Sequence, residues 1–112
     1  MEIQKVIHIP IFNYKIYVII TDDINKSTKK RRKRLGDIED GFFLGLCCSK
    51  KETDSCSVFL YKNSSINVIA HEVVHAIKYM ERYICTEFDE ETLAYHTGFL
   101  VEKIFNIINK TK

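Results

Sequence analysis

The spacing of apolar residues changes near residue 63, and this change limits the folds open to the chain. Before it, the run Ile3–Thr21 is dense in isoleucine and valine, which favours strands. After it, apolar residues recur every three or four positions, as in a helix with one buried face. These residues are Ile66, Ile69, Val73, Ala76, Ile77 and Met80. Strands followed by helices predict an α+β fold.

The first half predicts a small, mainly antiparallel sheet with one short helix inserted. Phe12-Asn13 can turn the first apolar run into a hairpin. Asn25–Leu35 can form a short polar helix, because side-chain acceptors precede it and a glycine follows it. The runs Gly41–Cys48 and Cys56–Tyr61 are the remaining strands, and the polar connection between them suits a second hairpin.

Two helices are predicted in the second half of the chain. Ser64 and Ser65 are good N-cap residues for the first helix, which carries the apolar stripe. The second helix begins near Asp89-Glu90-Glu91, since acidic residues suit the positive end of a helix dipole. It continues towards the C-terminus with apolar residues at helical spacing.

Length and composition indicate one globular domain over residues 1–112. The chain has room for one core, and 46% hydrophobic with 29% charged residues excludes intrinsic disorder. No apolar run approaches the roughly 20 residues needed to cross a bilayer. The first residues include Glu2, Gln4, Lys5 and His8, which is unlike a signal peptide. We therefore expect a cytoplasmic protein with no membrane segment and with its four cysteines reduced.

The first predicted helix contains His71-Glu72-Val73-Val74-His75, an H-E-x-x-H motif. Residues four apart lie one turn apart on the same face, so both imidazoles can reach one Zn²⁺ ion. Glu72 is rotated by 100° from His71, beside the metal, where a general base can take a proton from a metal-activated water. The alternative is a pair of surface histidines with an incidental glutamate.

The second predicted helix is expected to supply the third metal ligand, because a catalytic zinc takes three protein ligands and leaves one position open. The candidates are Asp89, Glu90, Glu91, His96 and Glu102. Glu91, Ala94 and Gly98 fall in one narrow stripe, whose small residues would let this helix approach the first. The residues on the opposite side, which can enter the core, are Leu93, Leu100 and Ile104. We predict Glu91 as the ligand.

Two segments resemble the small H-E-x-x-H zinc peptidases of the gluzincin type. They are Ile69-Ala-His-Glu-Val-Val-His-Ala-Ile77 and Asp89-Glu-Glu-Thr-Leu-Ala-Tyr-His-Thr-Gly-Phe-Leu100. The sequence is similar in particular to compact versions encoded by bacteriophages and prophages, most strongly over residues 66–105. In that family a glutamate helix with an E-x-x-A core supplies the third ligand, and Glu91-Thr-Leu-Ala94 matches this core.

The resemblance implies a zincin-like fold and a zinc-dependent hydrolase that cleaves peptide bonds in a host cytoplasm. The implied zinc ligands are His71, His75 and Glu91. Glu72 would be the general base. Tyr95, one turn after Glu91, could donate to the developing oxyanion, although an aromatic residue there can equally be packing beside the ligand. An extended peptide substrate could pair with an edge strand at Ser57–Tyr61.

Six consecutive cations stand out in a chain whose net charge is only +2. They are Lys29, Lys30, Arg31, Arg32, Lys33 and Arg34. Such a run can contact phosphates or an acidic surface. On a helix, however, the charges would wrap around almost the whole circumference and could not all face one ligand. The alternative is a solvated helix face.

The sequence leaves two further hypotheses open beside the peptidase. One is a non-catalytic protein in which zinc stabilises a small fold that serves in binding or structure. The other is a basic adaptor that docks acidic partners through Lys29–Arg34 and does not use the histidines. The role of Glu72 distinguishes the peptidase from the non-catalytic zinc protein, because a structural zinc needs only ligands whereas hydrolysis needs that carboxylate.

Overall fold

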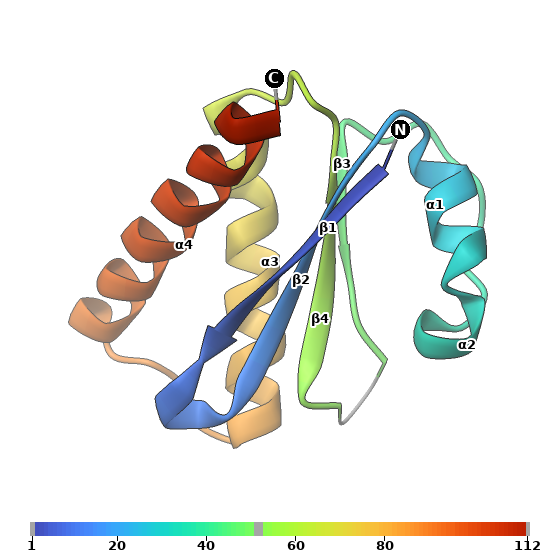
Figure 1. The fold of residues 1–112 in the computed structure, drawn as a ribbon. Coiled ribbons are helices and arrows are strands. Elements are labelled where there is room, and N and C mark those ends of the chain that lie inside the picture. Colours follow the sequence, from blue (N-terminus) through green and yellow to red (C-terminus); the bar gives the residue numbers. More distant parts are fainter. Residues whose placement is uncertain (1, 51–52, 112) are drawn as a thin grey trace.

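The computed structural model describes residues 2–50 and 53–111 and has a four-stranded sheet with helices on both faces (Figure 1). The strands are β1 (Glu2–Ile9), β2 (Tyr14–Thr21), β3 (Gly45–Cys48) and β4 (Ser55–Leu60). The helices are α1 (Ile24–Lys30), α2 (Arg32–Leu35), α3 (Ile66–Ile84) and α4 (Glu90–Thr111). Helices α3 and α4 cover one face of the sheet, and α1 and α2 cover the other (Figure 1).

The sheet has the strand order β1-β2-β4-β3 and is mixed. β1 and β2 form the predicted antiparallel hairpin, whose turn is a 3-10 helix at Pro10–Phe12 followed by Asn13 with φ of 51°. β3 and β4 form the second predicted hairpin. β2 and β4 are parallel. The α+β class is therefore confirmed, with two of the three strand pairs antiparallel.

β4 is an interior strand, so the prediction of an edge strand at Ser57–Tyr61 is wrong. β4 lies between β2 and β3, and its residues Val58, Phe59 and Leu60 are fully buried because helices cover both faces. The hairpin pattern gives only the neighbour on one side, whereas the parallel pairing with β2 joins segments about 40 residues apart. In the described part of the chain, the edges of the sheet are β1 and β3.

The predicted polar helix at Asn25–Leu35 is present but broken into two. Asp23 caps α1 by accepting a hydrogen bond from the backbone N–H of Lys26 at 3.1 Å. At Arg31 the backbone leaves the helical region, with φ of −108° and ψ of 21°, and α2 then ends at Gly36 with φ of 79°. This positive φ, which other residues rarely adopt, explains the glycine.

The predicted strand at Gly41–Cys48 is shorter in the structure, where β3 begins only at Gly45. Two of the residues before it are strongly exposed, Phe42 at 93% and Leu44 at 63%. An apolar sequence predicted a strand there, but these side chains find no place in the core. They lie instead at the rim of the sheet.

The main core lies between the sheet and the pair α3 and α4. Five of the six residues in the predicted stripe of α3 are fully buried, whereas Ile66, in the first turn, is 54% exposed. From α4 the core receives Leu100, Ile104 and Ile108, and Leu93 packs against it. This fixes the orientation of α3 and directs its opposite face to solvent. Over the described residues, no helix has the length and apolar character that crossing a membrane requires.

Candidate metal centre

His71, Glu72 and His75 lie together on α3. One ligand atom from each residue falls within 4.8 Å of the other two, and the two imidazole rings are 5.0 Å apart between centroids. Ser65 caps the helix by accepting a hydrogen bond from the backbone N–H of Val68 at 3.3 Å, so the motif sits in a well-formed helix. Both histidines are exposed, because the opposite face of α3 is buried. The structure thus brings the two imidazoles together on one turn of α3, and their binding of a metal ion stays a prediction.

Glu72 differs from the two histidines in being buried, at 5% exposure. Its side chain lies against β3, where a Cβ atom added to Gly45 would be 3.1 Å from both Cγ and Oε2 of Glu72. Burial raises the pKa of Glu72, and electrostatic interactions with His71 and His75 oppose this shift. A carboxylate held in this way beside two imidazoles is suited to proton transfer.

A pocket of about 320 Å³ opens beside this group of residues. Its lining residues are Phe42, Phe43, Leu44, Gly45, Asn67, Val68, His71 and Glu72. The first residue of β3, Gly45, lines the pocket, and β3 is an edge strand whose outer side pairs with no other strand in the part of the chain that the structure describes. The pocket therefore combines a buried acid, a metal-binding type of side chain and free backbone hydrogen-bonding groups.

Glu91 does not join the group. It is exposed in the first turn of α4. The start of α4 is tied to the end of α3, because the backbone N–H of Phe88 donates to Oε2 of Glu81 at 2.6 Å. Glu81 lies six residues after His75, which is about 9 Å along the helix axis. The role of Glu91 as a metal ligand stays a prediction.

The predicted close packing of the stripe that holds Glu91, Ala94 and Gly98 against α3 is wrong. All three residues are exposed, and a Cβ atom added to Gly98 would meet nothing within 4 Å. The apolar residues on the other side of α4 enter the core, as predicted, and so turn this stripe outward. Helical periodicity separated the two faces of α4 correctly. The prediction was wrong in packing the face with Glu91, Ala94 and Gly98 against α3.

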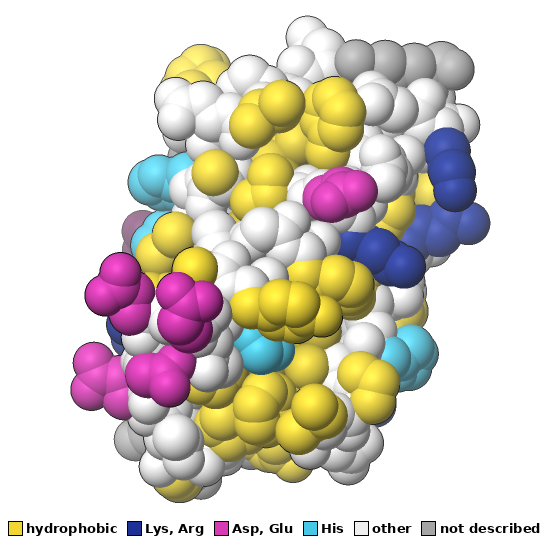
Figure 2. Space-filling model, turned by 90° about the vertical axis from the view of Figure 1, so that its left-hand side faces the viewer, with side chains coloured by type: hydrophobic (Ala, Val, Ile, Leu, Met, Phe, Trp, Pro, Cys, Tyr) yellow, Lys and Arg dark blue, Asp and Glu magenta, His cyan; other side chains and the backbone are white. Residues whose placement is uncertain are grey.

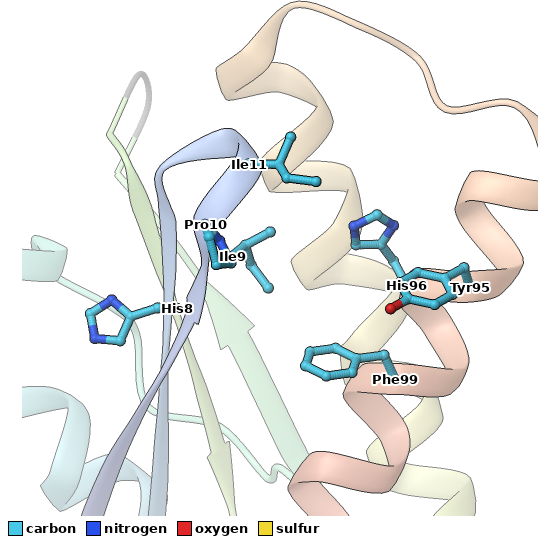
Figure 3. Close-up of a pocket in the computed structure, with 7 residues that line it drawn as sticks. All are labelled: His8, Ile9, Pro10, Ile11, Tyr95, His96 and Phe99. Carbon is cyan, nitrogen blue, oxygen red and sulfur yellow. The ribbon is translucent and has the colours of Figure 1, made fainter.

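Tyr95 lies in a second pocket, separate from the one that contains Glu72. This pocket has a volume of about 140 Å³ and is lined by His8, Ile9, Pro10, Ile11, Tyr95, His96 and Phe99. Tyr95 and Phe99 project from α4 on the side that faces the β1–β2 hairpin (Figure 3), and their rings are parallel, with centroids 6.5 Å apart. Hydrophobic side chains gather on this face of the molecule, with acidic side chains to one side of them (Figure 2). The role of Tyr95 as an oxyanion donor stays a prediction.

Sequence reasoning missed three parts of the pocket beside His71 and Glu72. Gly45 and Asn67 were not singled out, although a glycine at the start of a strand often marks a close approach of another group. The third part is the exposed segment Phe42–Leu44, which the apolar pattern placed within a strand. No sequence signal connects this segment with the histidines, since they meet only through tertiary packing.

Comparison of the chain with protein-family models, with curated proteins and with solved structures found no match. The likeness to gluzincin peptidases therefore depends on the segments 69–77 and 89–100 alone. Among the described residues, only His71, Glu72 and His75 form a group of three side chains that could hold a metal ion. The imidazoles of His71 and His75 are donors that zinc accepts, so these two residues fit the ion, and a third protein ligand would come either from Glu72 itself or from outside this group.

Proposed function

We propose that this protein is a zinc-dependent hydrolase that cleaves peptide bonds, with His71 and His75 as metal ligands and Glu72 as general base. The observation that carries the proposal is the position of Glu72, which is buried against β3 and within 4.8 Å of both imidazoles. A glutamate that was incidental to the motif would gain nothing from this burial, because an unpaired buried carboxyl is unfavourable.

The residues of the pocket divide the chemistry between them. When bound, zinc supplies Lewis-acid polarisation of the scissile carbonyl and lowers the pKa of the attacking water towards about 7. Glu72 takes the proton from that water and passes it to the leaving amine.

The free edge of β3 replaces Ser57–Tyr61 as the place where a substrate would pair. An extended peptide could add to β3 as a further strand, and main-chain hydrogen bonds would then hold it beside Glu72. Phe42 and Leu44 lie exposed at the rim of the same pocket and could contact an apolar side chain of the peptide. This supports a peptide as the substrate class.

The test of the proposal replaces Glu72 with glutamine in zinc-loaded protein. Glu72→Gln should retain zinc at one ion per chain and lose peptide hydrolysis by a factor of about 10²–10⁴, the usual contribution of a general base. His75→Ala should lose the zinc itself. His8→Ala, which removes an exposed histidine outside the group, is the matched control and should change neither property. Hydrolysis by the Glu72→Gln protein at the parent rate would refute the mechanism.

One observation favours a second candidate, a non-catalytic zinc site that stabilises the fold. Glu72 belongs to the group of potential ligands and Glu91 does not, so the carboxylate of Glu72 could itself complete the coordination of the ion. In that case Glu72→Gln would lower zinc affinity together with thermal stability. The same variant thus separates the two candidates: the ion stays bound in a hydrolase and dissociates from a structural site.

A further inference from the structure

The structure divides the basic run into paired and unpaired charges. Three cations pair closely with acids: Lys29 with Asp40 at 3.1 Å, Arg32 with Asp37 at 3.0 Å, and Arg31 with Glu2 at 2.6 Å. Lys30 lies farther from Glu2, at 3.9 Å. Within residues 2–50 and 53–111, Lys33 and Arg34 have no ion pair. As predicted, the six charges do not all face one side.

A groove of about 380 Å³ collects the less neutralised members of the run. Its lining residues are Glu2, Gln4, Lys30, Arg31, Lys33 and Arg34. Four cations and one carboxylate therefore face the same space, and Arg31 already engages that carboxylate. The groove keeps an excess of positive charge, whereas Lys29 and Arg32 lie outside it.

Arg34 is held in a fixed position in this groove. Its guanidinium carbon lies 4.1 Å from the centre of the Tyr17 ring, and its Nη2 donates to Oγ of Ser57 at 3.1 Å. Its Nε is buried and has no hydrogen-bond partner among the described residues. A guanidinium carries five N–H donors, so three are left for an anion besides the buried Nε–H and the N–H that is bonded to Ser57. Because the side chain is already ordered, binding an anion costs little conformational entropy.

The positive charges extend along the groove and do not converge on one point. Lys30 lies near Glu2 at one end of β1, and Arg34 stacks on Tyr17, which pairs with Val6. Glu2 and Val6 are four residues apart, which is about 13 Å at roughly 3.3 Å per residue. One phosphate group, which accepts hydrogen bonds at about 2.7–2.9 Å, cannot reach both ends. A chain of phosphates can.

We propose that this groove binds the phosphate backbone of a nucleic-acid strand. The fixed guanidinium of Arg34 suits a phosphate, whose oxygens accept paired hydrogen bonds from its planar fork. The ring of Tyr17 is already covered by Arg34, so it offers no surface on which a base could stack. Binding through this groove is therefore independent of nucleotide sequence. It is also independent of the metal site, which lies on the helix layer across the sheet (Figure 1).

The experiment measures binding of a fluorescent oligothymidylate by anisotropy at several salt concentrations. Three phosphate contacts, from Lys30, Lys33 and Arg34, predict a slope of about −2 in a plot of log K against log salt, at about 0.7 per contact for a single strand. Lys33→Gln should reduce the magnitude of this slope by about 0.7. Lys29→Gln and Arg32→Gln remove the same charge from the same run outside the groove and should leave the slope nearly unchanged.

Two further measurements distinguish a strand of phosphates from other anionic ligands. Arg34→Lys keeps the charge but removes the planar fork, so it should weaken binding without changing the salt slope; circular dichroism checks that the variant is folded. Polyglutamate and inorganic phosphate, at matched charge concentration, should fail to displace the oligonucleotide. Displacement by either competitor, equal effects of Lys29→Gln and Lys33→Gln, or no binding at low salt would each overturn the proposal. Removing zinc with a chelator should leave the binding unchanged.

Discussion

Replacing Gly45 with alanine tests the contact between β3 and Glu72. A Cβ atom at this position would lie 2.9 Å from Cγ1 of Val68 and 3.1 Å from Cγ and Oε2 of Glu72. These distances are well inside the roughly 3.5–4.0 Å at which carbon atoms pack best, so the side chains of Val68 and Glu72, or the elements that carry them, must shift. We therefore expect Gly45→Ala to destabilise the fold and to displace the carboxylate of Glu72.

The magnitude follows from two opposing effects. Overpacking by one methyl group costs about 1–3 kcal/mol. The backbone at Gly45 is not in the left-handed region, so alanine also gains about 0.4–1 kcal/mol by restricting the unfolded chain. The expected net loss is therefore about 1.3 kcal/mol, within limits of about 0 and 2.6 kcal/mol. For a domain near 100 residues, each 1 kcal/mol lowers Tm by roughly 4–8 °C.

Gly98→Ala is the matched control for this measurement. Gly98 is exposed in the middle of α4, and an added Cβ atom would meet nothing within 4 Å. Alanine should raise the stability here by about 0.5–1 kcal/mol, the cost of a glycine inside a helix. Urea denaturation of both variants gives the two free energies of unfolding. If Gly45→Ala proves as stabilising as Gly98→Ala, β3 does not lie against Glu72 as described.

Two other predictions concern the thiols and the N-terminal ion pair. Burial raises the pKa of the Cys48 thiol to about 12, and Cys47 is buried, whereas Cys85 is exposed. A thiol reagent at pH 8 should therefore label Cys85 first in the native protein. Fast labelling of Cys48 would contradict this prediction. Burial alone would raise the pKa of Glu2, but its hydrogen bonds with Arg31 and Ser27 and the positive charges of Arg31 and Lys30 together outweigh burial and lower it. A carboxyl whose pKa is lowered by folding stabilises the fold at any pH above its pKa in the unfolded chain. The contribution of Glu2 should therefore be present at pH 7 and be lost as the pH falls through the folded pKa, which lies below 4.5. Glu2→Gln should therefore flatten the acid side of the stability profile, and an unchanged profile would count against the ion pair.

Local sequence patterns predicted which helices and strands form more completely than they predicted which elements lie side by side. The stripe of α3 and the serine before it depend only on residues within a few turns, and the structure confirms both. The interior position of β4 depends on its parallel pairing with β2, which no local pattern encodes. The break of the polar helix at Arg31 likewise coincides with a hydrogen bond to Glu2, 29 residues away in the sequence.

The candidate site shows the same limit. The spacing of His71 and His75 places both imidazoles on one turn, and this required no knowledge of the tertiary structure. The helical periodicity of α4 separated its two faces but could not give the position of Glu91 along the axis of α3. That position depends on the connection between the helices and on the hydrogen bond from Phe88 to Glu81. The contact of Gly45 with Glu72 is equally invisible in the sequence.

The interior position of β4 has a consequence for how the protein can change. The helix with the two histidines follows directly after the most enclosed strand of the sheet, so its placement is shielded from alterations at the periphery. The segment Phe42–Leu44, by contrast, borders the same pocket from an exposed margin. Substitutions there can alter which molecules are accepted while the donor atoms keep their positions. In the proposed hydrolase, selectivity and metal chemistry would thus be separable by engineering within only 112 residues.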